Sequence, residues 1–248
     1  MPTIVVSDLH IGSPYFKHEW FRQFLEALPA DSRLVLNGDT IDNPRRQLAP
    51  PHRQVLDALI ALGDRLPVVW VEGNHDQGYR PPNPGKIVFK QAYALGDRRL
   101  FITHGAYFDN VMPYNRWFIQ LFRVLHELRM RLGAPPVHVA EYAKKWQFLY
   151  RYLNRNVRMN AVEYAREHGY RAVACGHVHH VEHTVIDGIE YINTGAWTES
   201  PTCYLSAVND ELSLLEWRGD YSSPSDGTNF QLSTLRSAAS NSANTASS

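Results

Sequence analysis

Asp8 and His10 are separated by one residue and directly follow the β-branched segment 3–6. On an extended backbone, side chains two residues apart point to the same side. A carboxylate and an imidazole on one side can bind one metal ion. The alternative is that Asp8 caps a turn and His10 is an ordinary surface histidine.

The same arrangement, a hydrophobic run that ends in polar residues, recurs four more times along the chain. The run 34–36 leads into Asn37-Gly38-Asp39, with Asp42 three residues later, and similar clusters occupy 72–76, 103–105 and 176–179. Open α/β sheets place their sites at the carboxyl ends of the strands, so these clusters should meet at one edge. The metal-binding residue types among them are Asp8, His10, Asp39, Asn74, His104, His177 and His179.

This set of seven side chains predicts a site for two metal ions. Carboxylate, amide oxygen and imidazole ligands suit Mn, Fe or Zn better than soft metals. Seven ligands are too many for one tetrahedral ion and fit two ions that share a bridging ligand. Two ions about 3.5–4 Å apart can bind a phosphoryl group and generate hydroxide from a bridging water.

Alternating hydrophobic patterns predict the elements that position these clusters. Strands at 3–6, 34–37 and 67–71 alternate with helices over 16–28 and 54–62, which is a βαβαβ unit with right-handed crossovers. Further strands are predicted at 86–90, 98–103, 172–175, 181–186, 189–193, 204–208 and 212–217. We expect two stacked sheets with helices outside, in one domain over 1–220, followed by a disordered tail over 221–248 rich in Ser, Ala and Asn.

A helical insertion is predicted between His104 and Gly176, over about 108–168, with helices at 111–132, 139–151 and 156–167. Its first helix is rich in aromatic residues, and basic residues outnumber acidic ones from Arg116 to Arg171. An insertion of this kind, acting as a lid over the site, suits a substrate that is an anionic amphiphile, or contact with an anionic membrane surface. The alternative is a solvated helical hairpin packed on the core. The candidate substrate-binding residues are Trp117, Phe118, Phe122, Lys144 and Lys145.

The composition excludes several classes of protein. The 25 Lys and Arg residues balance the 25 Asp and Glu residues, so no overall charge favours nucleic acid as a partner. The two cysteines fit neither a zinc spacing nor a disulfide framework. With no signal peptide recognised and no hydrophobic run near the ~20 residues of a membrane span, we expect a cytoplasmic protein, with peripheral contact to the inner face of the membrane.

The five clusters together resemble the motif set of the calcineurin-like metallophosphoesterases. The motifs are Asp8-x-His10, Gly38-Asp39-x-x-Asp42, Gly73-Asn74-His75-Asp76, His104-Gly105 and Gly176-His177-x-His179. The resemblance implies an α/β fold, a four-layer α-β-β-α sandwich. It implies one ion on Asp8, His10, Asp39 and His179, and a second on Asp39, Asn74, His104 and His177, with Asp39 as the bridge. His75 matches the family's catalytic histidine, paired with the Asp42 carboxylate.

Within that superfamily, the chain resembles the UDP-2,3-diacylglucosamine pyrophosphatase group of lipid A synthesis. The similar features are Ser7-Asp8-Leu9-His10, the insertion after His104 and the segment Gly195-Ala196-Trp197-Thr198-Glu199. This chain departs from the well-known branch of that group at three positions. That branch has arginine in place of His75, glutamate in place of Asp42 and aspartate in place of Ala106.

Three hypotheses about function follow. The first is a manganese-dependent pyrophosphatase acting on a lipid-linked nucleotide, with a metal-bridged hydroxide attacking phosphorus. The second is a phosphodiesterase or phosphomonoesterase of broader specificity, which His75 favours. The third is a scaffold without enzymatic activity, which would have no need of seven ligands.

Overall fold

Three parallel strands from the N-terminal half form the centre of the first sheet. The computed structural model describes residues 1–111, 147–209 and 211–218. Its N-terminal half contains β1 (Thr3–Val6), α1 (His18–Ala27), β2 (Arg33–Asn37), α2 (Pro50–Leu62) and β3 (Val68–Val71). β1 pairs with β2 and β2 with β3, both in parallel, which confirms the predicted βαβαβ unit.

The first sheet is completed by β4 (Val88–Lys90) beside β3 and by a C-terminal hairpin, β10 (Cys203–Val208) and β11 (Glu211–Glu216), beside β1. The strand order is β11-β10-β1-β2-β3-β4. Both faces of β1, β2 and β3 are covered, since nearly every residue in them is buried. Strands buried on both faces are continuous hydrophobic runs, as these are.

The second sheet has the order β5-β6-β7-β9-β8. Its strands are β5 (Tyr93–Leu95), β6 (Leu100–Ile102), β7 (Ala172–Cys175), β8 (Glu182–Ile186) and β9 (Ile189–Asn193). β6, β7 and β9 run parallel, and the Asp187-Gly188 turn joins β8 and β9 as an antiparallel hairpin. A short 3-10 helix, η1 (Ala106–Phe108), follows β6, and α5 (Gln147–Glu167) precedes β7.

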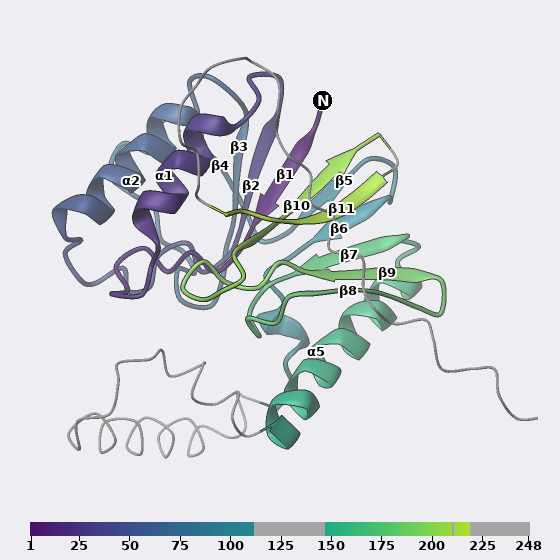
Figure 1. The fold of residues 1–248 in the computed structure, drawn as a ribbon. Helices are drawn as coiled ribbons and strands as arrows, with labels where there is room; N and C mark the ends of the chain where they lie inside the picture. Colours follow the sequence, from purple (N-terminus) through teal and green to yellow (C-terminus); the bar gives the residue numbers. More distant parts are fainter. Residues whose placement is uncertain (112–146, 210, 219–248) are drawn as a thin grey trace, which may run out of the picture.

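Three hydrophobic clusters separate the chain into four layers, α-β-β-α, as predicted (Figure 1). Phe21 and Phe24 of α1 pack with Leu56 of α2 against the outer face of the first sheet. Alternate residues of the same strands, such as Val35 and Val69, face the second sheet in the middle cluster. The outer face of the second sheet is covered by α5 and η1.

Two details differ from the sequence prediction. The chain was expected to break between helices at 139–151 and 156–167, but α5 is continuous from Gln147 to Glu167. β5 was not predicted, because its three residues show only a short alternation at the edge of the sheet. The first predicted lid helix, the start of the second, and the tail over 221–248 lie outside the described residues.

Among the residues that the structure describes, no helix has both the length and the apolar character needed to cross a membrane.

Candidate metal centre

The loops after β1 and β2 run side by side and hold the first two motifs together. The amides of Asp8 and His10 donate to the carbonyls of Gly38 and Asp39, at 3.1 and 2.8 Å. Ile11 and Ile41 then form an isolated parallel bridge, and the Asp42 amide donates to the Ile11 carbonyl at 3.1 Å. The two carboxylate-bearing loops therefore have a fixed register that extends beyond the strands.

Five of the seven predicted ligands have a backbone in the left-handed region. The φ angles are 53° for Asp8, 50° for His10, 48° for Asp39, 66° for His177 and 52° for His179. The prediction that Asp8 and His10 share an extended backbone was therefore wrong, because β1 ends at Val6. A non-glycine residue held at positive φ costs about 1–3 kcal/mol, and such strain concentrates at functional sites.

Two glycines make room for the ligands. Gly38 has a φ of 82°, and a Cβ there would lie 2.5 Å from the ring of His104. A Cβ on Gly73 would lie 2.2 Å from the Asp39 amide nitrogen. Any larger residue at either position would displace a predicted ligand.

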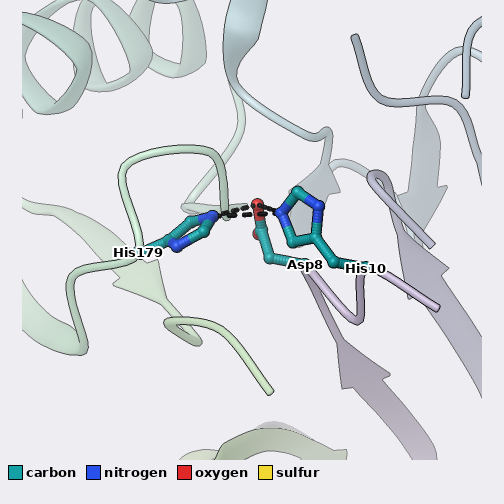
Figure 2. A group of neighbouring side chains, drawn as sticks. All are labelled: Asp8, His10 and His179. Carbon is teal, nitrogen blue, oxygen red and sulfur yellow. Dashed lines mark hydrogen bonds and ion pairs between the residues drawn. The ribbon is translucent and has the colours of Figure 1, made fainter. Parts of the chain in front are cut away.

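Asp8, His10 and His179 form one group of potential ligands (Figure 2). The Nε2 atoms of His10 and His179 lie 3.2 Å apart, and His179 Nε2 is 3.2 Å from Asp8 Oδ1. The second oxygen of Asp8 accepts a hydrogen bond from the His177 amide at 3.0 Å. Asp8 is fully buried.

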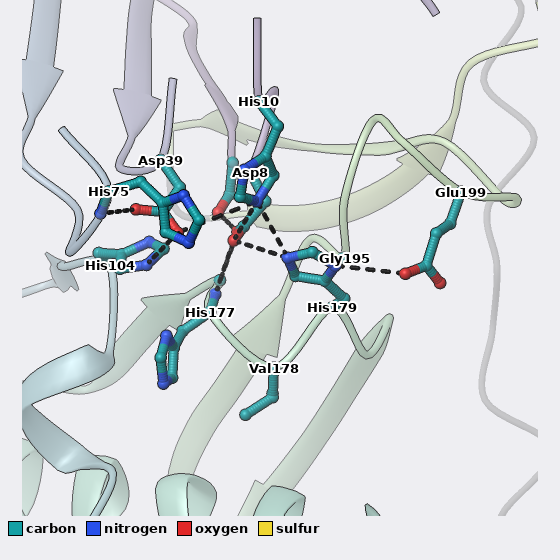
Figure 3. A network of polar contacts seen from close by, with 12 residues as sticks. Asp8, His10, Asp39, His75, His104, His177, Val178, His179, Gly195 and Glu199 are labelled. Carbon is teal, nitrogen blue, oxygen red and sulfur yellow. Dashed lines mark hydrogen bonds and ion pairs between the residues drawn. The ribbon is translucent and has the colours of Figure 1, made fainter. Parts of the chain in front are cut away.

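Asn74, His104 and His177 form a second group across the site. His104 and His177 are seen in Figure 3. The Asn74 side-chain oxygen lies 3.1 Å from His104 Nε2 and 3.1 Å from His177 Nδ1. Each of these residues comes from a different strand end, following β3, β6 and β7. The structure therefore places the predicted ligands in two groups at one edge of the sandwich.

Asp39 lies between the two groups. Its Oδ2 atom is 3.3 Å from His104 Nε2 on one side and 3.9 Å from His10 Nε2 on the other. Its Oδ1 atom accepts a hydrogen bond from the His75 amide at 2.8 Å, which fixes the carboxylate plane. A single carboxylate oxygen thus faces both groups, which suits a ligand that bridges two ions through one oxygen.

The outer nitrogen of every one of the four ligand imidazoles lies beside an oxygen atom. His10 Nδ1 is 3.2 Å from Asp42 Oδ1, and His179 Nδ1 is 3.2 Å from Glu199 Oε1. The other two contacts join His104 Nδ1 to the Asn37 carbonyl at 3.1 Å and His177 Nε2 to Asp109 Oδ2 at 3.0 Å. Outer oxygens of this kind orient metal-binding imidazoles.

Glu199 and Asp109 were not predicted as site residues. They lie 20 and 68 residues from the histidines that they contact, so no short spacing marks them. Burial of a carboxylate is the signal that the sequence could not supply: the side chains of Glu199 and Asp109 are 7% and 2% exposed.

His75 lies at the rim of the site, with 38% of its side chain exposed. Its Nδ1 is 2.8 Å from the main-chain carbonyl of Asp42, and the predicted partner, the Asp42 carboxylate, is farther away at 3.8 Å. Its Nε2 is 4.0 Å from Asp39 Oδ2. Asp42 therefore contacts two histidines, His75 through its carbonyl and His10 through its carboxylate.

Asp76, in the same motif, is a fully buried structural residue. Its carboxylate accepts hydrogen bonds from the amides of Gly73 and Thr40, both at 2.7 Å, and from the Trp70 indole at 3.1 Å. These bonds join the loop after β3 to the loop after β2. Asp76 thereby fixes Asn74 and His75 relative to Asp39.

We expect Asp76→Asn to lower the free energy of unfolding by at least ~2 kcal/mol, because hydrogen bonds to a charged acceptor are strong and the new amide would face N–H donors. Denaturant titration would measure the loss. Asp64→Asn is the matched control, since Asp64 is exposed and paired with Lys86 on the surface. Equal stability of the two variants would contradict this role.

The charges of the site suit cations. Burial lowers the pKa of His104, but Asp39 and Asp8 outweigh it and raise the pKa to about 9. Burial likewise lowers the pKa of His179, while Asp8 and Glu199 raise it to about 10. Burial raises the pKa of Asp39, yet the neighbouring histidines hold that pKa well below its usual range. Buried carboxylates and imidazoles are a donor set that divalent ions fit once the imidazoles have lost their protons.

We expect metal binding to release protons and to tighten as the pH rises from about 6 to about 8. Without metal, His104 and His179 keep their protons at neutral pH because their pKa values are about 9 and about 10. A metal ion must displace those protons, so higher pH favours binding. Calorimetric titration in two buffers of different ionisation enthalpy would count the protons. A pH-independent affinity would contradict the prediction.

Comparison with known proteins agrees with this geometry. The sequence profile of the calcineurin-like phosphoesterases matches residues 1–181. The chain belongs to this family of metal-dependent phosphoesterases. A search of curated protein sequences gave no match.

Solved structures to which the chain is similar include phosphoesterases. Yfce, a phosphoesterase from E. coli, is 19% identical, with a TM-score of 0.46 over 88% of this chain and 93% of its own. A predicted phosphoesterase from Streptococcus pneumoniae is 18% identical, with a TM-score of 0.40 over 87% and 88%. Vps29 from Entamoeba histolytica, complexed with Zn²⁺, is 15% identical, with a TM-score of 0.44 over 87% and 91%.

Proposed function

We propose that this protein hydrolyses phosphoric ester or anhydride bonds at a centre of two divalent metal ions, with manganese as the native metal. The observation that carries this proposal is the position of Asp39, whose Oδ2 atom faces both groups of ligands. Asp8, His10 and His179 would hold one ion with Asp39. Asn74, His104 and His177 would hold the other. Such ions, when bound, supply Lewis acidity and lower the pKa of a bound water.

His75 is proposed to protonate the leaving oxygen. It is the histidine of the site that is most exposed, and its Nδ1 contacts the Asp42 carbonyl, which leaves Nε2 directed toward the site near Asp39. A carbonyl can only accept a hydrogen bond, so it favours a proton on Nδ1, and the proton given to the leaving oxygen is the second proton, which the imidazolium form carries on Nε2. A general acid in this position stabilises the leaving group as the bond to phosphorus breaks.

Glu199 and Asp109 are proposed as positioning residues. Because each accepts a hydrogen bond from the outer nitrogen of a ligand histidine, it directs the other nitrogen toward the metal. His179 would then bind through Nε2 and His177 through Nδ1. Glu199 lies outside the residues matched by the family profile.

We expect Glu199→Ala to weaken metal binding ~10–100-fold, the usual effect of removing such a partner. Glu199→Gln should retain most of the affinity, since its amide oxygen can still accept the hydrogen bond. A chelator competition assay would measure both. Glu190→Ala is the matched control, because Glu190 lies 3.0 Å from His183 in a similar pair outside the site. Equal affinities for Glu199→Ala and Glu190→Ala would contradict the role.

For the substrate, we propose a nucleotide diphosphate linked to a lipid, in the class of UDP-2,3-diacylglucosamine, with peripheral contact to an anionic membrane. Support comes from the sequence resemblance around Ser7-Asp8-Leu9-His10 and Gly195–Glu199, and from the insertion after η1. Acyl chains would contact Trp117, Phe118 and Phe122, and Lys144 and Lys145 would meet anionic groups. A phosphodiesterase or phosphomonoesterase of broader specificity is the second candidate, favoured by His75.

A turnover screen with Mn²⁺ separates the two candidates. Wild-type protein would be assayed for UMP release from the diacylated sugar nucleotide and for nitrophenol release from aryl phosphates. A kcat/KM at least about 100-fold higher for the lipid nucleotide, roughly 2.7 kcal/mol, supports the pyrophosphatase. Comparable values for both substrates support the broader enzyme, and no turnover of any phosphate substrate overturns both.

A further inference from the structure

A cavity of about 400 Å³ lies between α5 and the start of β8, beside the candidate metal centre. Three arginines of α5 line it, namely Arg151, Arg155 and Arg158, at positions i, i+4 and i+7 of the helix. Residues with this spacing share one face of a helix. The cavity is therefore bordered by a stripe of positive charge.

Only part of this charge is neutralised. Arg158 forms an ion pair with Glu182, which also lines the cavity. Arg151 and Arg155 are exposed and pair with no acidic residue within the part of the chain that the structure describes. Like charges at i and i+4 destabilise a helix by a few tenths of a kcal/mol. An anion bound between the two arginines would remove that repulsion.

Two buried polar atoms at the cavity lack a hydrogen-bond partner among the described residues. Asn154 is only 7% exposed, and its side-chain oxygen accepts no hydrogen bond from any of them. Arg158 uses one terminal nitrogen on Glu182, while its buried Nε donates to no described atom. Buried polar groups are nearly always paired, and a ligand in the cavity would complete the hydrogen bonding of these two atoms. A phosphate oxygen would accept from Arg158 Nε, and a neighbouring hydroxyl of the ligand would donate to Asn154.

The cavity is adjacent to the metal-binding loop. The Tyr150 hydroxyl, which lines the cavity, lies 3.4 Å from the main-chain oxygens of Val178 and His179, residues seen in Figure 3. His180 directly follows His179 and packs edge-on against the Tyr150 ring, with 5.6 Å between ring centroids. A group bound in the cavity is thus one residue away from a proposed metal ligand.

We propose that this cavity binds a second phosphate group of the substrate, beyond the one that is hydrolysed. Arg151, Arg155 and Arg158 would neutralise that phosphate, and Asn154 would accept a hydrogen bond from a nearby hydroxyl. The inference rests on the proposed function and narrows it to substrates with two phosphate groups.

Two nucleotide substrates with the same leaving group test the proposal on the metal-loaded protein. One is a nucleoside 5′-(p-nitrophenyl phosphate), and the other carries an additional 3′-phosphate. We expect the second phosphate to lower KM about tenfold in the wild type, as one or two charged hydrogen bonds would. The double variant Arg151→Ala/Arg155→Ala should lose that advantage, with kcat and the KM of the simpler substrate changed less than twofold.

Arg166→Ala is the matched control, because Arg166 lies exposed on the same helix and pairs with Glu163. It should keep the tenfold advantage. If the wild type shows no advantage, or if the double variant keeps it, the proposal is overturned.

Direct binding separates this proposal from the proposed function. If neither substrate is hydrolysed, the proposed function fails. Calorimetric titration of the metal-loaded protein with inorganic phosphate then shows whether the cavity binds phosphate. The proposal is supported if the titrations show a phosphate site that is present in Arg166→Ala and absent from the double variant. Identical isotherms overturn it. A third outcome is that the double variant no longer binds vesicles of anionic lipid but binds phosphate as the wild type does. That result would assign Arg151 and Arg155 to membrane contact and would also overturn the proposal.

Discussion

Asp39→Asn should lower turnover by several orders of magnitude and reduce metal occupancy at both positions while the fold survives. The substitution preserves the volume of the side chain and removes a charge that faces both groups of ligands, at 3.3 Å from His104 and 3.9 Å from His10. Because the carboxylate also offsets the charge of the surrounding imidazoles, its loss weakens the site for any cation. Turnover and metal content of the purified variant are the measurements.

The control for this variant is Asp31→Asn, which makes the same chemical change at an exposed position. It should retain two metal ions and full turnover. Near-normal turnover of Asp39→Asn with two ions bound would show that another residue bridges the site.

His75→Ala should retain its metal and lose turnover ~10²–10⁴-fold, the range typical of a lost general acid. The reason is its position: the His75 side chain is 38% exposed at the rim of the site, and its Nε2 is 4.0 Å from Asp39 Oδ2. The loss should shrink for nitrophenyl esters, whose leaving group needs no proton. Measuring kcat/KM over a series of leaving groups would show this dependence.

His168→Ala provides a matched control, since His168 is an exposed histidine at the far end of α5. It should match the wild type with every substrate. If His75→Ala loses the same factor for good and poor leaving groups, His75 donates no proton. If it loses metal, His75 is a ligand.

The sequence was sufficient to place all seven predicted ligands at one edge of the sheets. This succeeds because each ligand follows a buried strand, and the parallel strands β1, β2, β3, β6 and β7 end on the same side. The local backbone could not be predicted in the same way. Asp8 and His10 come together through two left-handed residues and not through an extended strand.

Residues that act through tertiary contacts were the hardest to predict. Glu199 and Asp109 reach their histidines only after the chain folds, and an acidic residue in a loop is more often exposed. Asp42 was predicted as the partner of His75, but its carboxylate lies nearer to His10, at 3.2 Å. The motif identified the residue, and only the loop geometry showed which of its oxygens meets which ring.

Secondary structure, too, was predicted well where the local pattern is strong and missed where tertiary contacts decide it. The helices with a clear apolar stripe, α1 and α2, were predicted to within a few residues. The three-residue strand β5 carries too little pattern to be recognised, and its pairing with β6 decides its conformation. Continuous helix through 152–155 in α5 was missed because polar residues interrupt the apolar spacing there.

Anomalous diffraction from crystals of the manganese-loaded protein would test the two-metal centre most directly. Two peaks about 3.5–4 Å apart are expected. Asp8, His10 and His179 should surround one peak, and Asn74, His104 and His177 the other, with the Asp39 carboxylate in contact with both. A single peak, or two peaks of which Asp39 touches only one, would contradict this arrangement.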